Sequence, residues 1–138
     1  MIVSTKGRYA LRVMVYFVLH GSEEYIPLKE IAEAEGISQK YLESIMTTLS
    51  KGGFVDAVHG KGGGYRLNRK PSEYTVGSIL KLTEGSLAAV SCTSQGPAAC
   101  SRSTCCQTKP MWDKLDNMIN DFFEGITLAD LLDNNNKM

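Results

Sequence analysis

The feature that most constrains the fold is a three-residue corner, Gly36-Ile37-Ser38, between two stretches of helical periodicity. Gly36 can adopt the left-handed conformation that ends a helix, Ile37 can anchor the corner in a core, and Ser38 can cap the next helix. The flanking stretches, 28–35 and 39–50, repeat apolar residues at intervals of three and four. This pattern predicts a helix-turn-helix, although such corners also occur in structural bundles.

A glycine-rich hairpin is predicted directly after the second of these helices. Residues 54–58 and 65–67 have strand composition and flank the turn at 60–64, whose sequence is GKGGG. A hairpin that follows a recognition-type helix is a wing, whereas a nucleotide-binding glycine loop opens into a helix. The order of elements therefore predicts a winged helix-turn-helix in a mainly α chain with a small β-wing.

Three further helices are predicted around this motif. The first is capped near Ser4 and stopped by Gly21, and its apolar face is wide enough to be mostly buried. That face comprises Tyr9, Leu11, Val13, Met14, Phe17 and Leu19. Thr75 and Thr127 can cap two shorter helices. We assign residues 1–84 to one winged helix-turn-helix domain, because 138 residues with 43% apolar content suffice for one core.

The charged residues are unevenly distributed although their sum is zero. Fifteen Lys and Arg balance fifteen Asp and Glu, but residues 1–71 carry ten cations against seven acids, and 51–70 carry five against one. A cluster of cations confined to such a short segment is compatible with a solvated charged face. It is also the electrostatic footprint expected of a nucleic-acid-binding element.

A long helix, predicted to open at Pro110, carries an apolar stripe along one side. Its apolar residues recur at intervals of three, four and three: Trp112, Leu115, Ile119 and Phe122. The stripe can pack on the chain's own core or on a partner helix, and twofold symmetry suits a DNA-binding protein. We therefore assign residues 110–138 to a dimerisation helix and a tail.

All four cysteines fall within fifteen residues of a segment, 85–109, that lacks helical periodicity: Cys92, Cys100, Cys105 and Cys106. Clustered thiolates suit an iron–sulfur cluster or zinc, although their spacing departs from the Cys-x-x-Cys pairs of most zinc sites. Metal-free thiol redox switching is a third possibility. Catalysis is not expected, because no loop histidine or Cys-x-x-Cys motif is present to activate a thiolate.

Several stretches together resemble the Rrf2 family of bacterial winged-helix regulators, and particularly its iron–sulfur branch. The stretches that carry the resemblance are 4–10, 36–38, 41–43, 60–67, 75–77 and 126–128, which read STKGRYA, GIS, YLE, GKGGGYRL, TVG and ITL. The resemblance covers essentially the whole chain. It implies a homodimer that reads a twofold-related site on double-stranded DNA, with the long helix near the C-terminus as its interface.

The same resemblance implies an iron–sulfur cluster, with [2Fe–2S] favoured over [4Fe–4S]. The cysteines that match those of the branch are Cys92, Cys100 and Cys106. Lys109 stands where the branch supplies a histidine ligand, and Arg8 stands where nitric-oxide-sensing relatives supply an aspartate. The fourth ligand therefore stays open, and Cys105 is one candidate for it.

The expected DNA contacts come from the recognition helix and the wing. Residues in the first turn and a half of a recognition helix face base edges and phosphates, and here they are Ser38, Gln39, Lys40, Tyr41 and Glu43. Gln39 can pair with adenine, Glu43 can accept from cytosine, and Lys40 suits a phosphate. In the wing, Lys61 and Arg66 can neutralise phosphates. His59 stands where the branch has an arginine directed to the minor groove.

The sequence thus predicts a homodimeric, DNA-binding transcription regulator whose affinity responds to an iron–sulfur cluster, and not an enzyme. No apolar run approaches the roughly 20 residues of a membrane span, and no secretory signal is recognisable, so we expect a cytoplasmic protein without a membrane partner. The alternatives are a zinc-dependent or thiol-redox regulator of the same fold, or a regulator controlled by binding a metabolic enzyme.

Overall fold

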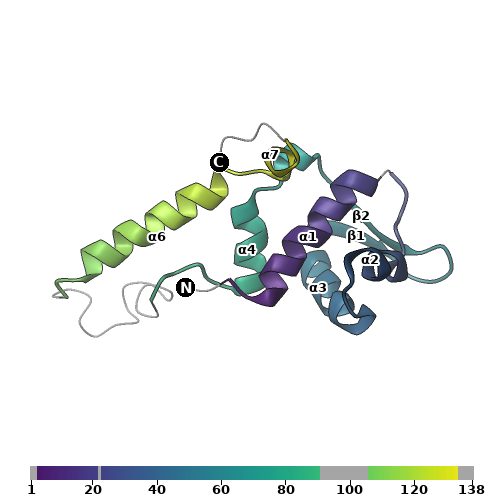
Figure 1. Cartoon of the computed structure of the whole chain (residues 1–138), viewed down its shortest axis with the longest axis horizontal. Helices are drawn as coiled ribbons and strands as arrows, with labels where there is room; N and C mark the ends of the chain where they lie inside the picture. The colour runs from purple at the N-terminus through teal and green to yellow at the C-terminus, as the bar shows by residue number, and fades with distance from the viewer. Residues whose placement is uncertain (1–2, 22, 91–105, 134–138) are drawn as a thin grey trace.

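The computed structural model describes residues 3–21, 23–90 and 106–133 (Figure 1). The elements in chain order are α1 (Thr5–His20), α2 (Leu28–Glu35), α3 (Gln39–Lys51), β1 (Val55–Val58), β2 (Gly64–Leu67), the short 3-10 helix η1 (Pro71–Glu73), α4 (Val76–Glu84), α6 (Lys109–Glu124) and α7 (Leu128–Leu132). The predicted mainly α fold with a two-stranded wing is confirmed. We call the part from α1 to α4 the head.

The corner between α2 and α3 has the predicted structure. Gly36 has φ 66° and ψ 33°, in the left-handed region, and the N–H of Ile37 donates to Ala32 O at 3.1 Å. The Ser38 hydroxyl accepts from the N–H of Tyr41 at 3.2 Å and so caps α3. These local contacts fix the angle at which α3 leaves α2.

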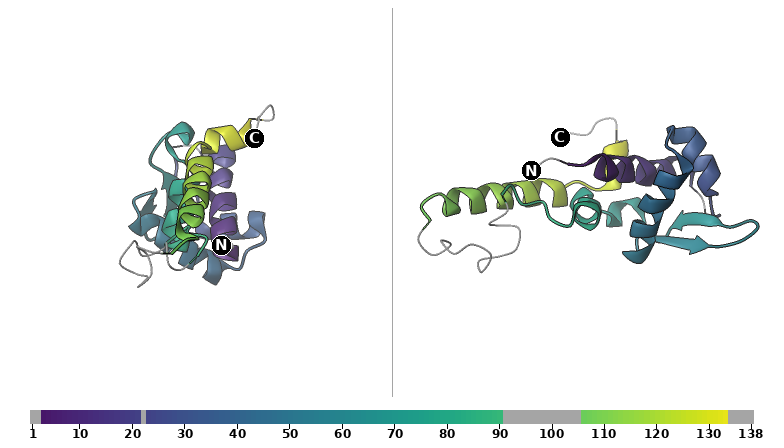
Figure 2. Two further views of the ribbon diagram at one scale, coloured as in Figure 1. Left: turned by 90° about the vertical axis from the view of Figure 1, so that its left-hand side faces the viewer. Right: turned by 90° about the horizontal axis from the view of Figure 1, so that it is seen from below.

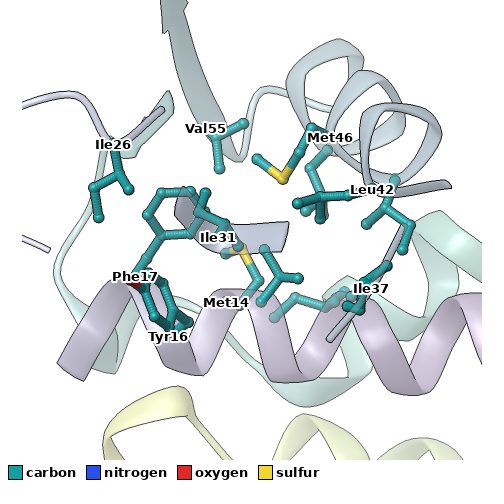
Figure 3. Packing of buried hydrophobic residues seen from close by; sticks show 14 of the residues in the cluster. Met14, Tyr16, Phe17, Ile26, Ile31, Ile37, Leu42, Met46 and Val55 are labelled. Atoms are coloured by element: carbon teal, nitrogen blue, oxygen red, sulfur yellow. The ribbon is translucent and has the colours of Figure 1, made fainter. Parts of the chain in front are cut away.

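The inner face of α3 is buried in the main core of the head (Figure 3). The residues of α3 that are completely inaccessible to solvent are Leu42, Ile45, Met46 and Leu49. They belong to the same cluster as Val13, Met14 and Phe17 of α1 and Ile31 of α2. The expectation that Leu19 completes the α1 face is wrong: this side chain is 62% exposed, because it follows the fully buried Ala10 by about two and a half turns and therefore lies on the opposite side of α1.

The wing is joined to the rest of the head by a backbone bridge that the sequence did not predict. The antiparallel pairing of β1 with β2 runs from Val55 opposite Leu67 to Val58 opposite Gly64. On the other edge of β2, Ile26 and Tyr65 exchange N–H···O bonds of 2.8 and 2.9 Å. A Cβ at Gly64 would lie 2.2 Å from Ile26 O, so this approach requires glycine.

Helix α6 extends away from the head as an arm, and its C-terminal end is attached to α4 (Figures 1 and 2). After α6, the chain returns through α7, where the N–H of Leu128 donates to Tyr74 O at 3.0 Å and that of Val76 to Ile126 O at 2.8 Å. A second core cluster lies at this joint and contains Val76, Leu80, Leu87 and Ile126. Among the described residues, no helix is long and apolar enough to cross a membrane.

Candidate functional site

The N-terminal half of α3 presents its polar residues on the side opposite the core. Gln39, Lys40 and Glu43 are exposed, because the intervening Leu42 points inward. Tyr41 is half-buried, with its ring 5.9 Å from that of Tyr9 on α1. This surface therefore offers a donor–acceptor amide, a cation and a carboxylate on a rigidly supported helix, which are the groups that read base edges and phosphates.

Ser38 has a local structural role besides the predicted contact. It is exposed, and its hydroxyl accepts the hydrogen bond that caps α3. The hydroxyl still has a proton to donate to a phosphate oxygen, because capping uses it as an acceptor. Its contact with DNA stays a prediction.

A glycine-rich turn between β1 and β2 forms the tip of the wing. His59 and Lys61 are exposed there, and in the described ranges neither forms a hydrogen bond or ion pair. The turn is closed by the N–H of Gly63, which donates to Gly60 O at 3.0 Å, with Gly60 at φ 97°. Because β1 packs directly against α3, the wing and the recognition helix form one continuous part of the head (Figure 1).

Arg66, the third residue predicted for the wing, is engaged inside the protein. Its Nη1 donates to Glu23 O at 2.7 Å, and its Nε lies 3.8 Å from Asp56 Oδ2. The guanidinium carbon is 4.5 Å from the centre of the Tyr25 ring. Arg66 therefore lies at the base of the wing, while His59 and Lys61 lie at its tip.

Two cations of the N-terminal helix, which sequence reasoning left without a role, connect α1 to the helix-turn-helix. Lys6 Nζ donates to Thr48 Oγ1 on α3 at 2.9 Å. Arg12 Nη2 donates to Glu35 O at 2.8 Å and to Glu35 Oε2 at 3.1 Å. These partners are 42 and 23 residues apart, so no local signal could indicate them. Part of the positive charge counted in the sequence therefore serves the fold.

The α6 arm has two apolar faces rather than one. Ile119 and Phe123 pack against the chain's own second core cluster, and Trp112 is half-buried. A neighbouring row, which we call the exposed stripe, stays accessible: Met111 (54%), Leu115 (36%), Met118 (61%) and Phe122 (57%). Of the predicted interface residues, the structure therefore leaves Leu115 and Phe122 open and gives Ile119 a partner within the chain.

The exposed stripe has the spacing of a helix–helix seam. Its intervals of four, three and four residues match the a and d positions of a heptad. Met111 and Met118 are not among the four residues of the predicted stripe. Their role depends on which side of α6 faces the head, and periodicity alone does not reveal that.

Of the candidate cluster ligands, Cys92, Cys100 and Cys105 lie outside the described residues. Cys106 is half-buried, with its Sγ 3.2 Å from Thr108 Oγ1 just before α6. Among the described residues, no three His, Cys, Asp or Glu residues gather as a metal site.

Two aspartates of α6 hold the residues that flank the cysteine segment. Lys109 Nζ donates to Asp113 Oδ2 at 2.6 Å, an i,i+4 ion pair within α6. The N–H of Ala89 donates to Asp116 Oδ1 at 2.8 Å. The chain before the cysteines is therefore attached to the arm through Asp116, and the chain after Cys106 continues directly into α6.

The carboxylate of Glu124 adds polar contacts to the apolar packing between the arm and α4. Glu124 Oε1 accepts from Lys81 Nζ at 3.0 Å, and Oε2 accepts from the Thr75 hydroxyl at 3.0 Å. The hydrogen bond from Lys81 is the main reason why the pKa of Glu124 is lowered from its ordinary value. A Cβ at Gly77 would lie 2.4 Å from Glu124 Oε1, so the helices approach closely at this point.

The chain is similar in sequence to known transcription regulators over nearly all its length. Residues 3–134 match the model of the Rrf2 family, described as iron-dependent transcriptional regulators. The HTH-type transcriptional regulator IscR of Aliivibrio salmonicida is 40% identical over 133 residues, which are 96% of this chain and 78% of that protein. IscR of Serratia proteamaculans is 39% identical over 132 residues, with 96% and 79% covered.

Solved structures agree with this similarity. The structure of T. potens IscR has a TM-score of 0.73 at 37% identity, covering 96% of this chain and 86% of that one. CymR, the global cysteine regulator of B. subtilis, has a TM-score of 0.75 at 30% identity, covering 95% of each chain. Both support the winged-helix architecture described above.

Proposed function

The chain belongs to the Rrf2 family of transcriptional regulators, and from this premise we propose that it is a homodimer that binds twofold-related DNA sites with an affinity set by an iron–sulfur cluster. It is a DNA-binding regulator rather than an enzyme, as its relatives are. The observation that carries the proposal is the outward row Gln39, Lys40 and Glu43 on a helix whose inner face is completely buried. The protein would act in the cytoplasm.

The geometry assigns separate roles to the two parts of the DNA-binding surface. Gln39 and Glu43 suit base edges in the major groove, where an amide pairs with adenine and a carboxylate accepts from cytosine N4. Lys40 and Lys61 carry uncommitted positive charge for phosphates on either side of the groove. His59, exposed at the wing tip, suits the minor groove.

Dimerisation is supported by the exposed stripe of α6. Monomeric proteins rarely expose a continuous row of large apolar side chains. Packing this row against its twofold copy would bury Met111, Leu115, Met118 and Phe122 in each subunit, and a closed twofold contact would place two recognition helices for two half-sites. Trp112 would lie at the edge of the same seam.

For the cofactor, we propose that Cys92, Cys100 and Cys106 hold a [2Fe–2S] cluster, with Cys105 outside the first coordination shell and the fourth ligand not assigned. Thiolates are the ligands that such clusters prefer, and the half-buried Cys106 can supply one. When bound, the cluster supplies a redox-sensitive centre that orders its ligand segment. Asp116 attaches the chain before that segment to α6, the chain after it continues into α6, and Glu124 joins α6 to the head.

The proposal is tested on protein purified without oxygen. Iron, sulfide and zinc are assayed and the visible spectrum is recorded for the wild type and four single Cys→Ser variants. We expect a coloured protein that loses iron and sulfide when Cys92, Cys100 or Cys106 is changed and keeps them in Cys105→Ser. A colourless zinc protein, or a colourless metal-free protein with redox-active thiols, would contradict the cluster.

The same samples are then tested for binding to a duplex selected by the wild type from a randomised library. Fluorescence anisotropy should give different dissociation constants for the cluster-loaded dimer and for the dimer whose cluster has been removed. Equal dissociation constants would mean that the cluster does not control DNA binding. Another signal, for example the binding of a metabolic enzyme, would then control it. Absence of any selected sequence would contradict site-specific DNA binding itself.

A further inference from the structure

We propose that Arg66 is a positioning residue that sets the orientation of the wing against the α1–α2 connection, and that it does not bind a DNA phosphate. The proposal rests on the DNA-binding function proposed above. It replaces the expectation, drawn from charge alone, that Arg66 and Lys61 act alike. The contacts of the two side chains differ in kind.

Two nitrogens of the Arg66 guanidinium face groups of the protein. Nη1 donates to the carbonyl of Glu23 at 2.7 Å, a charge-assisted hydrogen bond to backbone that precedes α2. Nε faces the carboxylate of Asp56 at 3.8 Å, from the residue opposite Arg66 in the β1–β2 register. The planar group lies over Tyr25, with 4.5 Å between its carbon and the ring centre. Three different kinds of contact therefore hold one orientation.

These contacts join the wing to the 23–26 segment, and the same two parts are also joined by one pair of backbone hydrogen bonds. Ile26 and Tyr65 pair directly, and Arg66 follows Tyr65 while Glu23 and Tyr25 precede Ile26. Arg66 thus extends the connection between the wing and the 23–26 segment beyond a single backbone bridge. A two-stranded hairpin of four residue pairs needs such support to keep a fixed angle.

The charge around Arg66 also disfavours a phosphate. Arg66 lines a hollow whose other charged residues are Glu23, Glu24, Asp56, Glu73, Arg69 and Lys70. Four carboxylates face three cations there, and Arg69 is itself engaged, donating to Gly53 O at 3.1 Å. An approaching phosphate would meet a negatively charged rim, whereas at Lys61 it would meet an exposed ammonium.

The test compares Arg66→Gln and Arg66→Lys with the matched control Lys61→Gln in the full-length protein. Binding to the selected duplex and to a random duplex of equal length is measured over a series of salt concentrations. A residue that neutralises one phosphate contributes about one to the slope of log affinity against log salt concentration. We expect Lys61→Gln to lower that slope by about one. Arg66→Gln should weaken binding about tenfold at an unchanged slope.

Amide hydrogen exchange, measured without DNA, supplies a second readout. Arg66→Gln and Arg66→Lys should both accelerate exchange at Ile26 and Tyr65 by about tenfold, while Leu42 and Ile45 exchange as in the wild type. Tyr25→Leu, which removes no charge, should reproduce the acceleration and add little to Arg66→Gln in the double variant. Lys61→Gln should leave these amides unchanged.

A slope lowered by about one in Arg66→Gln, or a normal exchange rate at Ile26 and Tyr65, would overturn the proposal. Full rescue of both affinity and exchange by Arg66→Lys would also do so, because a lysine supplies the charge without the planar fork. If the wild type binds no duplex at all, the proposed function fails. The exchange measurements still decide whether Arg66 positions the wing.

Discussion

The head and the α6 arm use their apolar residues in opposite ways. Helix α3 of the head has 13 residues and completely buries four large side chains within its own chain. Helix α6 has 16 residues and buries none of them fully. The head therefore carries the interactions that determine its own fold. The arm leaves an apolar row exposed, which the proposed dimer would cover.

The largest expected effect comes from placing a charge in the exposed stripe. Met118→Asp should raise the dimer dissociation constant by at least about 100-fold. The twofold axis of the proposed dimer repeats the substitution in both subunits, so the seam loses two methionines and gains two carboxylates. The head should stay folded, since Met118 is 61% exposed within one chain. Sedimentation velocity over a range of concentrations measures the first outcome, and circular dichroism measures the second.

Asn117→Asp is the matched control for this change, because Asn117 is also exposed but lies about a third of a turn away from the stripe. It should leave the dimer intact. Ile119→Asp provides a contrast: it should destabilise the chain itself, since Ile119 packs on the second core cluster. A wild type that is monomeric at micromolar concentration would contradict the proposal that the exposed stripe is a dimer interface.

The next effect in size belongs to the head. Leu49→Ala should lower the free energy of unfolding by about 2–5 kcal/mol, because a fully buried leucine leaves a cavity when truncated. Thr47→Ala on the exposed side of the same helix should change it by less than about 0.5 kcal/mol. Urea unfolding at one protein concentration compares the two. Equal costs would mean that α3 is held by its caps rather than by its core.

Glu43→Ala should change the base preference of the head and leave dimerisation through the arm unchanged. A carboxylate that accepts from cytosine contributes about 1–3 kcal/mol of discrimination between bases. Removing it should flatten the preference across a panel of single-base variants of the selected duplex more than it weakens total binding. An unchanged preference, with the dimer intact, would assign base reading to other residues of α3.

The smallest effect concerns the joint between the two regions. The pKa of Glu124 is lowered in the folded protein from its ordinary value of 4.5, chiefly by Lys81. The carboxylate therefore contributes stability above about pH 4.5, and this contribution is lost as pH falls through the lower folded pKa. For a partly exposed pair it amounts to less than about 1 kcal/mol. Glu124→Gln should flatten that segment of the stability–pH curve, which acid titration of the circular dichroism signal records.

The same contrast explains how far the sequence could predict the structure. The helix-turn-helix was predictable because its signals are local: Gly36 ends one helix, Ser38 caps the next, and periodicity marks the buried face of α3. The two faces of α6 were not separable, because Ile119 and Met118 are neighbours and both are apolar. Only the position of α6 against α4 shows which residue the chain itself covers.

Long-range contacts account for the rest of what the sequence did not reveal. Arg66 and Glu23 are 43 residues apart, and nothing in the composition of the wing distinguishes Arg66 from Lys61. The bridge between Ile26 and Tyr65 involves one residue pair, too short to appear as a strand pattern. Charge counts locate a basic segment correctly, but they do not tell which of its cations the fold has already used.

Helix α6 is held near its C-terminal end, where Ile119 and Phe123 pack on the second core cluster and Glu124 binds Lys81, and this end is the fulcrum of a lever. Sixteen residues give it a length of about 24 Å from that point to its distal end beside Cys106. A tilt of one degree at the fulcrum moves the distal end by about 0.4 Å over this length. In the other direction, a force applied beside the cysteine segment reaches α4 as a torque with the full helix as its moment arm.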